Sequence, residues 1–61
     1  MREVINFNQK VNVTLVSGEV VTMTINEISD YALRTMRDVT LVPELLSYNV
    51  AIRGSVKFTL I

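Results

Sequence analysis

The stretch that decides the fold reads KVNVTLVSGEVVTMTI and covers residues 10–25. On both sides of Gly18, apolar and polar residues alternate, which is typical of half-buried β-strands. The apolar face of each strand consists of Val11, Val13 and Leu15 in the first and Val21, Met23 and Ile25 in the second. The pattern therefore predicts a β-hairpin that turns at Gly18.

The length of the turn sets how the two strands pair. A two-residue loop would place Val13 opposite Thr22 and mix apolar with polar side chains. A three-residue loop over residues 16–18 places Val13 opposite Val21 and puts Gly18 in the left-handed conformation that such loops require. Register and turn chemistry agree on the three-residue loop.

Residues 27–39 have a different period. The apolar positions that recur at helical spacing are Ile28, Tyr31, Ala32, Met36 and Val39. Asn26 or Ser29 is a candidate N-cap, and Asp30 falls in the first turn, where acidic residues are favoured. Taken alone, this stretch predicts a one-sided helix.

The rest of the chain predicts a second hairpin. Pro43 lacks a backbone donor and pushes its predecessor to an extended shape, so residues 40–46 are expected to form a loop or a strand boundary. Residues 47–61 then alternate on both sides of Gly54, which supplies a tight reversal. Residues 1–9 fit a short strand or a single helical turn, and the pattern does not choose between them.

Size and composition favour self-association. The chain has 61 residues, 49% of them apolar, which indicates one domain. A chain of this size buries only about 60% of the surface that it exposes when unfolded. It contains no Cys and no His, so disulfides and a Cys-based metal site cannot add stability. An oligomer is the remaining route.

Charge and residue types exclude several classes of function. Six basic and six acidic residues cancel, which argues against a non-specific binder of duplex DNA. Without His or Cys there is no imidazole base and no thiol nucleophile, so an enzyme is not expected. We expect no cofactor, metal or small-molecule substrate. The first residues are too polar for a signal peptide and no apolar run has the length of a membrane span, so a cytoplasmic protein is expected.

The final strand lacks the usual protection of a sheet edge. Residues 58–61 are mostly apolar, and Lys57 is the only nearby charge. Edge strands normally carry charges, Pro or a bulge that prevent pairing with other chains. This segment is therefore either an interior strand or a strand that pairs with the next subunit.

Two segments together resemble the signature of Sm and Sm-like proteins, which include bacterial Hfq. The first covers residues 10–39, and the second is the Ile52–Ser55 step. The positions that match the first motif are Lys10, Val11, Val13, Leu15, Gly18, Ile25, Tyr31, Met36, Asp38 and Val39. Met23 stands where the family has a second Gly, and Leu33 stands where it has a base-reading Asn.

The resemblance implies a mainly β fold, a small, strongly bent antiparallel barrel of five strands with its N-terminal helix short or missing. Residues 31–39 would then be the third strand, against their helical pattern. The last two strands would pair with neighbouring subunits to close a homo-oligomeric ring. Val56, Phe58 and Leu60 would lie in that interface.

The resemblance also implies a function, the binding of single-stranded RNA, or of DNA as a second candidate, at loops that face the pore. The residues that these loops carry are Ser29, Asp30, Tyr31, Arg53, Gly54 and Ser55. A base would stack between the Tyr31 ring and the Arg53 guanidinium. Simpler interpretations are a core or interface role for Tyr31 and a solvated Arg53.

The helical pattern and the zero net charge support an alternative. It is an α+β domain of β-β-α-β-β order that acts as a small, non-enzymatic protein-interaction or structural module. Such a module would oligomerise or dock through a sheet edge.

Overall fold

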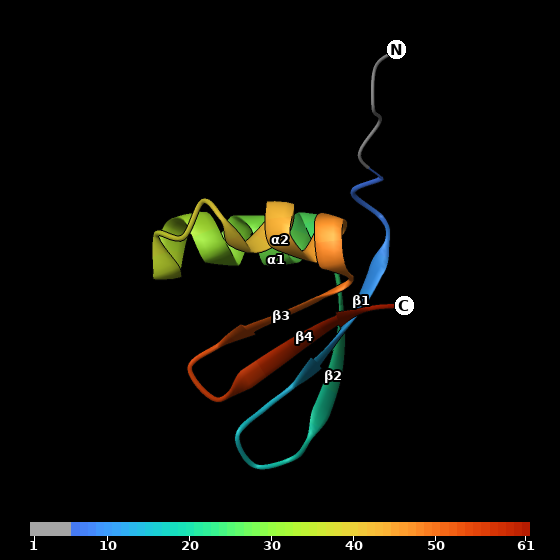
Figure 1. Cartoon of the computed structure of the whole chain (residues 1–61), viewed down its shortest axis with the longest axis vertical. Coiled ribbons are helices and arrows are strands. Elements are labelled where there is room, and N and C mark those ends of the chain that lie inside the picture. The colour runs from blue at the N-terminus through green and yellow to red at the C-terminus, as the bar shows by residue number, and fades with distance from the viewer. Residues whose placement is uncertain (1–5) are drawn as a thin grey trace.

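The computed structural model describes residues 6–61 and shows a mixed fold of sheet and helices (Figure 1). In chain order the elements are β1 (Lys10–Thr14), β2 (Val20–Thr24), α1 (Ile25–Tyr31), a π-helical turn η1 (Ala32–Met36), α2 (Leu41–Tyr48), β3 (Val50–Arg53) and β4 (Val56–Leu60). A short strand or a helical turn was one expectation for residues 1–9, and residues 1–5 of that stretch lie outside the described part. In the remainder, the backbone N–H of Gln9 donates to the Asn6 carbonyl and closes a turn.

The first hairpin has the predicted register. Val13 pairs with Val21, and Val11 pairs with Met23. The loop over residues 16–18 is closed by the Leu15 N–H, which donates to the Glu19 carbonyl. Gly18 has a φ of +94°, a backbone conformation that L side chains rarely adopt. The alternation and the turn residue together were sufficient to predict this element.

The prediction of a helix after the first hairpin is also confirmed, but its N-cap is Thr24. The Thr24 hydroxyl accepts from the Glu27 N–H at 3.2 Å, and the Glu27 carboxylate accepts from the Thr24 N–H at 2.9 Å. This reciprocal pair is a capping box, so the helix starts directly at the end of β2. The strand that the family resemblance implied over residues 31–39 is wrong, because the chain stays helical up to Met36. It ends at Arg37, which has a φ of 55°.

The expectation of a loop around Pro43 is wrong as well. Pro43 lies in the first turn of α2, which begins at Leu41. The first N–H groups of a helix have no partner within the helix, so a proline costs no hydrogen bond there. The Thr40 carbonyl accepts from the Glu44 N–H at 3.0 Å, the first bond of the helix after the proline.

The second hairpin joins the first in one sheet. β3 and β4 reverse at Gly54, which has a φ of 62°, as the sequence predicted. The strand order is β2-β1-β4-β3, all antiparallel. The sheet has four strands and does not close, so the five-stranded barrel is not formed. The element order agrees with the alternative α+β prediction, with two helices in the place of one.

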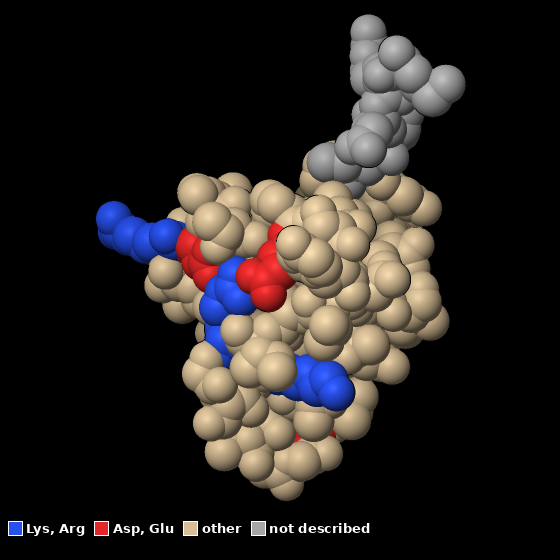
Figure 2. All heavy atoms as spheres, in the orientation of Figure 1, with Lys and Arg blue, Asp and Glu red and all other residues tan. Residues whose placement is uncertain are grey.

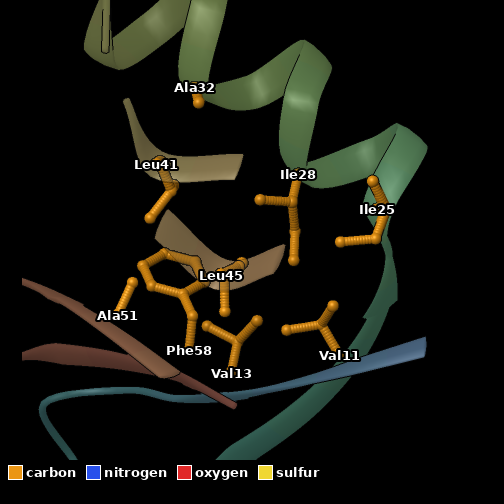
Figure 3. Packing of buried hydrophobic residues seen from close by; sticks show 9 residues of the cluster. All are labelled: Val11, Val13, Ile25, Ile28, Ala32, Leu41, Leu45, Ala51 and Phe58. Atoms are coloured by element: carbon orange, nitrogen blue, oxygen red, sulfur yellow. The ribbon is translucent and has the colours of Figure 1, made fainter. Parts of the chain in front are cut away.

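Both helices pack on the same face of the sheet (Figure 1). Their apolar side chains point toward those of β1, β3 and β4, as Figure 3 shows. The buried core consists of Val11, Val13, Ile25, Ile28, Ala32, Leu41, Leu45, Ala51 and Phe58. The alternate residues of the strands, among them Asn12, Thr22, Lys57 and Thr59, belong to the opposite face because side chains alternate along a strand. Residues 6–61 thus form two layers, and the helices of this part of the chain lie on one side of the sheet.

Candidate functional site

Arg53, at the end of β3, ties together the loop after η1, helix α2 and its own strand. Its Nε donates to the Asp38 carboxylate at 2.6 Å, and its Nη2 donates to the Glu44 carboxylate at 2.8 Å. Nη2 also donates to the Thr40 hydroxyl at 3.1 Å. Nη1 donates to the Ile52 carbonyl at 2.9 Å. Arg53 has few free donors left, so its first role is a clamp between elements that are distant in sequence.

The clamp shifts the pKa of Asp38 and that of Arg53 itself. The Asp38 carboxylate accepts from the Thr40 hydroxyl at 2.6 Å and from the Thr40 N–H at 2.9 Å. These bonds, first that of the hydroxyl and then that of Arg53, lower the pKa of Asp38 from 3.8 to about 2. The pKa of Arg53 is raised, chiefly by its hydrogen bond to Glu44 and then by that to Asp38. The red and blue atoms that meet between the helices and β3 in Figure 2 agree with these ion pairs.

An apolar pocket of about 350 Å³ lies between α1, η1 and the inner face of the sheet. Its lining consists of Val13, Leu15, Met23, Ile28, Tyr31, Met36, Arg53, Val56 and Phe58. Tyr31 is about half exposed, at 49%, and Met23, Met36 and Val56 are partly buried. The two methionines supply flexible, polarisable surface that adapts to different apolar groups.

The structure brings only part of the predicted RNA site together. Tyr31 and Arg53 line the same pocket, as a stacking site between them requires. Asp30 instead pairs with Arg34 along the helix surface, at 2.8 Å. Ser29 lines a second, smaller hollow of about 230 Å³ beside Leu33.

Gly54 and Ser55, the last two residues of that predicted site, are exposed in the β3–β4 turn. The guanidinium of Arg53 is already held by Asp38 and Glu44. A base that stacks on Arg53 would have to do so without displacing these carboxylates.

The residues predicted for the subunit interface lie on the inner face of β4. Phe58 is only 4% exposed and belongs to the core, while Val56 and Leu60 pack against that core. β4 is hydrogen-bonded to β1 on one side and to β3 on the other. Of the two interpretations of this segment, an interior strand agrees with the structure of the single chain.

The exposed strand edge that the sequence reasoning missed is that of β2. Within residues 6–61, the sheet ends at β2 on one side and at β3 on the other. The bond from the Leu15 N–H to the Glu19 carbonyl shows which pairs of the β1–β2 ladder are hydrogen-bonded. Counting along the register, the backbone groups of Val21 and Met23 face β1, while those of Val20 and Thr22 face outward.

The side chains of β2 do not protect this edge. The strand reads VVTMT, without a charge or a proline. Val20 is 55% exposed and Val21 is 37% exposed. The sequence contains this signal, because β2 carries no charge at all, whereas the last strand carries Lys57. Choosing between the two strands required the strand order, which alternation does not reveal.

The opposite edge, that of β3, is guarded. The Ile52 carbonyl, which points away from β4 in this register, already accepts from the Arg53 side chain. The charges of Asp38 and Glu44 lie close to the same end of the strand. Charged groups at an edge are a common protection against pairing with other chains. The two edges of the sheet therefore differ chemically.

The comparisons with known proteins add no relative. No family model, no curated protein and no solved structure matches this chain. Among residues 6–61, no cluster of acidic side chains is arranged to hold a metal ion. None of the helices in the described chain is long and apolar enough to cross a membrane.

Proposed function

We propose that this chain is a small, non-enzymatic protein-interaction module that binds an extended polypeptide segment along the outer edge of β2. The observation that carries this proposal is the uncharged edge at Val20 and Thr22, whose backbone N–H and C=O groups face outward. An extended segment that pairs with this edge adds a strand to the sheet, a recurring mode of peptide recognition.

The chemistry of the edge indicates what the bound segment contains. Backbone hydrogen bonds supply affinity without regard to sequence, and side chains at alternate positions supply selectivity. On the helix-covered side, the segment would lie beside Val21 and Met23, and Met23 also lines the apolar pocket. We therefore expect a segment that alternates apolar with small polar residues and carries no charge at its centre.

A peptide-display selection on the immobilised protein tests this proposal. The selected peptides should be uncharged at their centre and alternate in polarity. Thr22→Pro should abolish their binding, because it removes an outward N–H while leaving the β1 ladder intact. Ile52→Pro is the matched control, since it removes the equivalent outward N–H from β3 and should leave binding unchanged.

Hydrogen exchange on the unaltered protein gives a second measurement that does not depend on any variant. Saturation with a selected peptide should slow exchange at the amides of Val20 and Thr22, which have no partner in the β1 ladder. Peptides that protect only other amides, or that bind Thr22→Pro as well as the original protein, would contradict strand addition at β2.

Single-stranded RNA is a second candidate ligand, favoured by the presence of Tyr31 and Arg53 in one pocket. Base stacking on an aromatic side chain contributes about 1–3 kcal/mol per base. Fluorescence anisotropy with labelled oligouridine and with labelled oligothymidine tests this candidate. Tyr31→Ala should weaken the binding of either oligonucleotide. Titrations that never saturate would leave strand addition as the proposed function.

A further inference from the structure

We infer that the segment bound at the edge of β2 is the β2 strand of a second copy of this chain, antiparallel and related by a two-fold axis at Val21. This inference rests on the proposed function and names its partner. The result would be a dimer with one continuous sheet through both subunits and the guarded β3 strands at its two ends.

The backbone groups of the edge are self-complementary. Val20 and Thr22 present their N–H and C=O groups outward, and they lie at equal distance in sequence from Val21. If Val20 of one copy pairs with Thr22 of the other, the symmetric pair forms at the same time. Each such antiparallel pair exchanges two hydrogen bonds, so about four bonds form. Thr24, the next outward position, already donates its N–H to Glu27 and marks where the pairing ends.

The side chains fit the same register. On the helix-covered side, Val21 meets Val21 of the second copy, and both have free surface, being 37% exposed. On the open side, Val20 lies opposite Thr22. Cross-strand pairs of β-branched residues stabilise a sheet. Both contacts would bury side chains that the single chain leaves exposed.

Charge repulsion does not oppose the pairing of two β2 strands. β2 carries no charged side chain, and the chain has equal numbers of basic and acidic residues. The nearest charge is Glu19, which in this register lies opposite Met23 of the second copy. The two Glu19 side chains thus fall on opposite sides of the axis and do not face one another. Like charges directly opposite each other would destabilise a strand pair.

Chain length points in the same direction. A chain of 61 residues buries only about 60% of the surface that it exposes when unfolded, and oligomerisation is one of the few routes by which such a chain gains stability. The contact is short, so the dimer belongs with weak, small interfaces and should depend on concentration.

The test uses sedimentation velocity on the full chain and a charge swap at the axis. The unaltered protein should shift from one chain mass toward twice that mass as its concentration rises. Val21→Lys and Val21→Glu should each be monomeric, because each places two like charges at the axis. An equimolar mixture of the two variants should form a dimer again, because the axis then holds one cation and one anion.

The outcomes separate this inference from the proposed function. Variants that dimerise alone as well as the unaltered protein would overturn the axis at Val21, as would a mixture of folded variants that stays monomeric. An unaltered protein that is monomeric at every concentration would overturn the second copy as partner. If this monomeric protein still bound the selected peptides and Thr22→Pro did not, strand addition at β2 would remain supported. If the protein neither dimerised nor bound such peptides, both proposals would be overturned.

Discussion

The capping box at the start of α1 gives a quantitative test of the helix that replaces the expected third strand. Thr24→Ala removes the hydroxyl that accepts from the Glu27 N–H at 3.2 Å. Thr24→Ser keeps that hydroxyl while also losing the branched methyl group. The difference between the two variants therefore isolates the cap from the strand preference of threonine at the end of β2.

Thr24→Ala removes two hydrogen bonds of the hydroxyl, the one it accepts from the Glu27 N–H and a longer one, at 3.3 Å, that it donates to the Glu27 carboxylate. Replacing a capping hydroxyl by alanine costs about 1 kcal/mol, within a range of roughly 0.5–2 kcal/mol. The bond from the Thr24 N–H to the Glu27 carboxylate, at 2.9 Å, does not use the hydroxyl and remains in Thr24→Ala. For a domain of this size, about 1 kcal/mol lowers the Tm by roughly 4–8 °C.

Thermal and urea unfolding, followed by circular dichroism, measure this difference. Thr24→Ala should be less stable than Thr24→Ser by about 1 kcal/mol. Combining Thr24→Ala with Glu27→Ala should cost less than the sum of the two changes, because the two residues act as a unit. Equal stability of the alanine and serine variants would refute the reasoning, since a strand at this position has no N-terminal N–H groups to cap.

Two further predictions concern charge and backbone conformation. The folded-state pKa of Asp38 is depressed from 3.8 to about 2, so its contribution to stability is present above pH 3.8 and is lost as the pH falls toward 2. The Tm deficit of Asp38→Asn relative to the unaltered protein should therefore shrink over that interval, and a deficit that is the same at pH 2 and pH 6 would contradict it. Arg37 ends the helical segment with a φ of 55°, so Arg37→Gly should raise stability by a few tenths to about 1 kcal/mol in urea unfolding. A loss of stability in that variant would show that the Arg37 side chain contributes more than its backbone conformation costs.

Local patterns predicted the elements whose information is local. The alternation around Gly18 was sufficient for the register of β1 and β2, because a one-residue slip would turn every apolar side chain to the wrong face. The helical spacing of Ile28 and Ala32 likewise predicted a helix, and both side chains are buried against the sheet. The family resemblance instead implied a strand over residues 31–39. The helical spacing predicted this stretch correctly as far as Met36.

Other features were misread because one residue has more than one structural use. Pro43 predicts a loop or a strand boundary, yet the first turn of a helix accepts proline. Thr24 continues the alternation of the second strand, yet it is also the N-cap of the helix that follows. The Ile52–Ser55 step matches a family motif, but here it combines a tight turn at Gly54 with a clamp at Arg53.

The sequence by itself determined both hairpins and the first helix, because these elements depend on contacts between residues close in the chain. Only the tertiary structure decided the strand order β2-β1-β4-β3, and with it which edge of the sheet is exposed. It also decided the partners of Arg53, which come from a loop and a helix nine to fifteen residues away in the chain. Strand order and ion pairs between distant elements depend on how the layers pack, and alternation along a single strand carries no information about its neighbours.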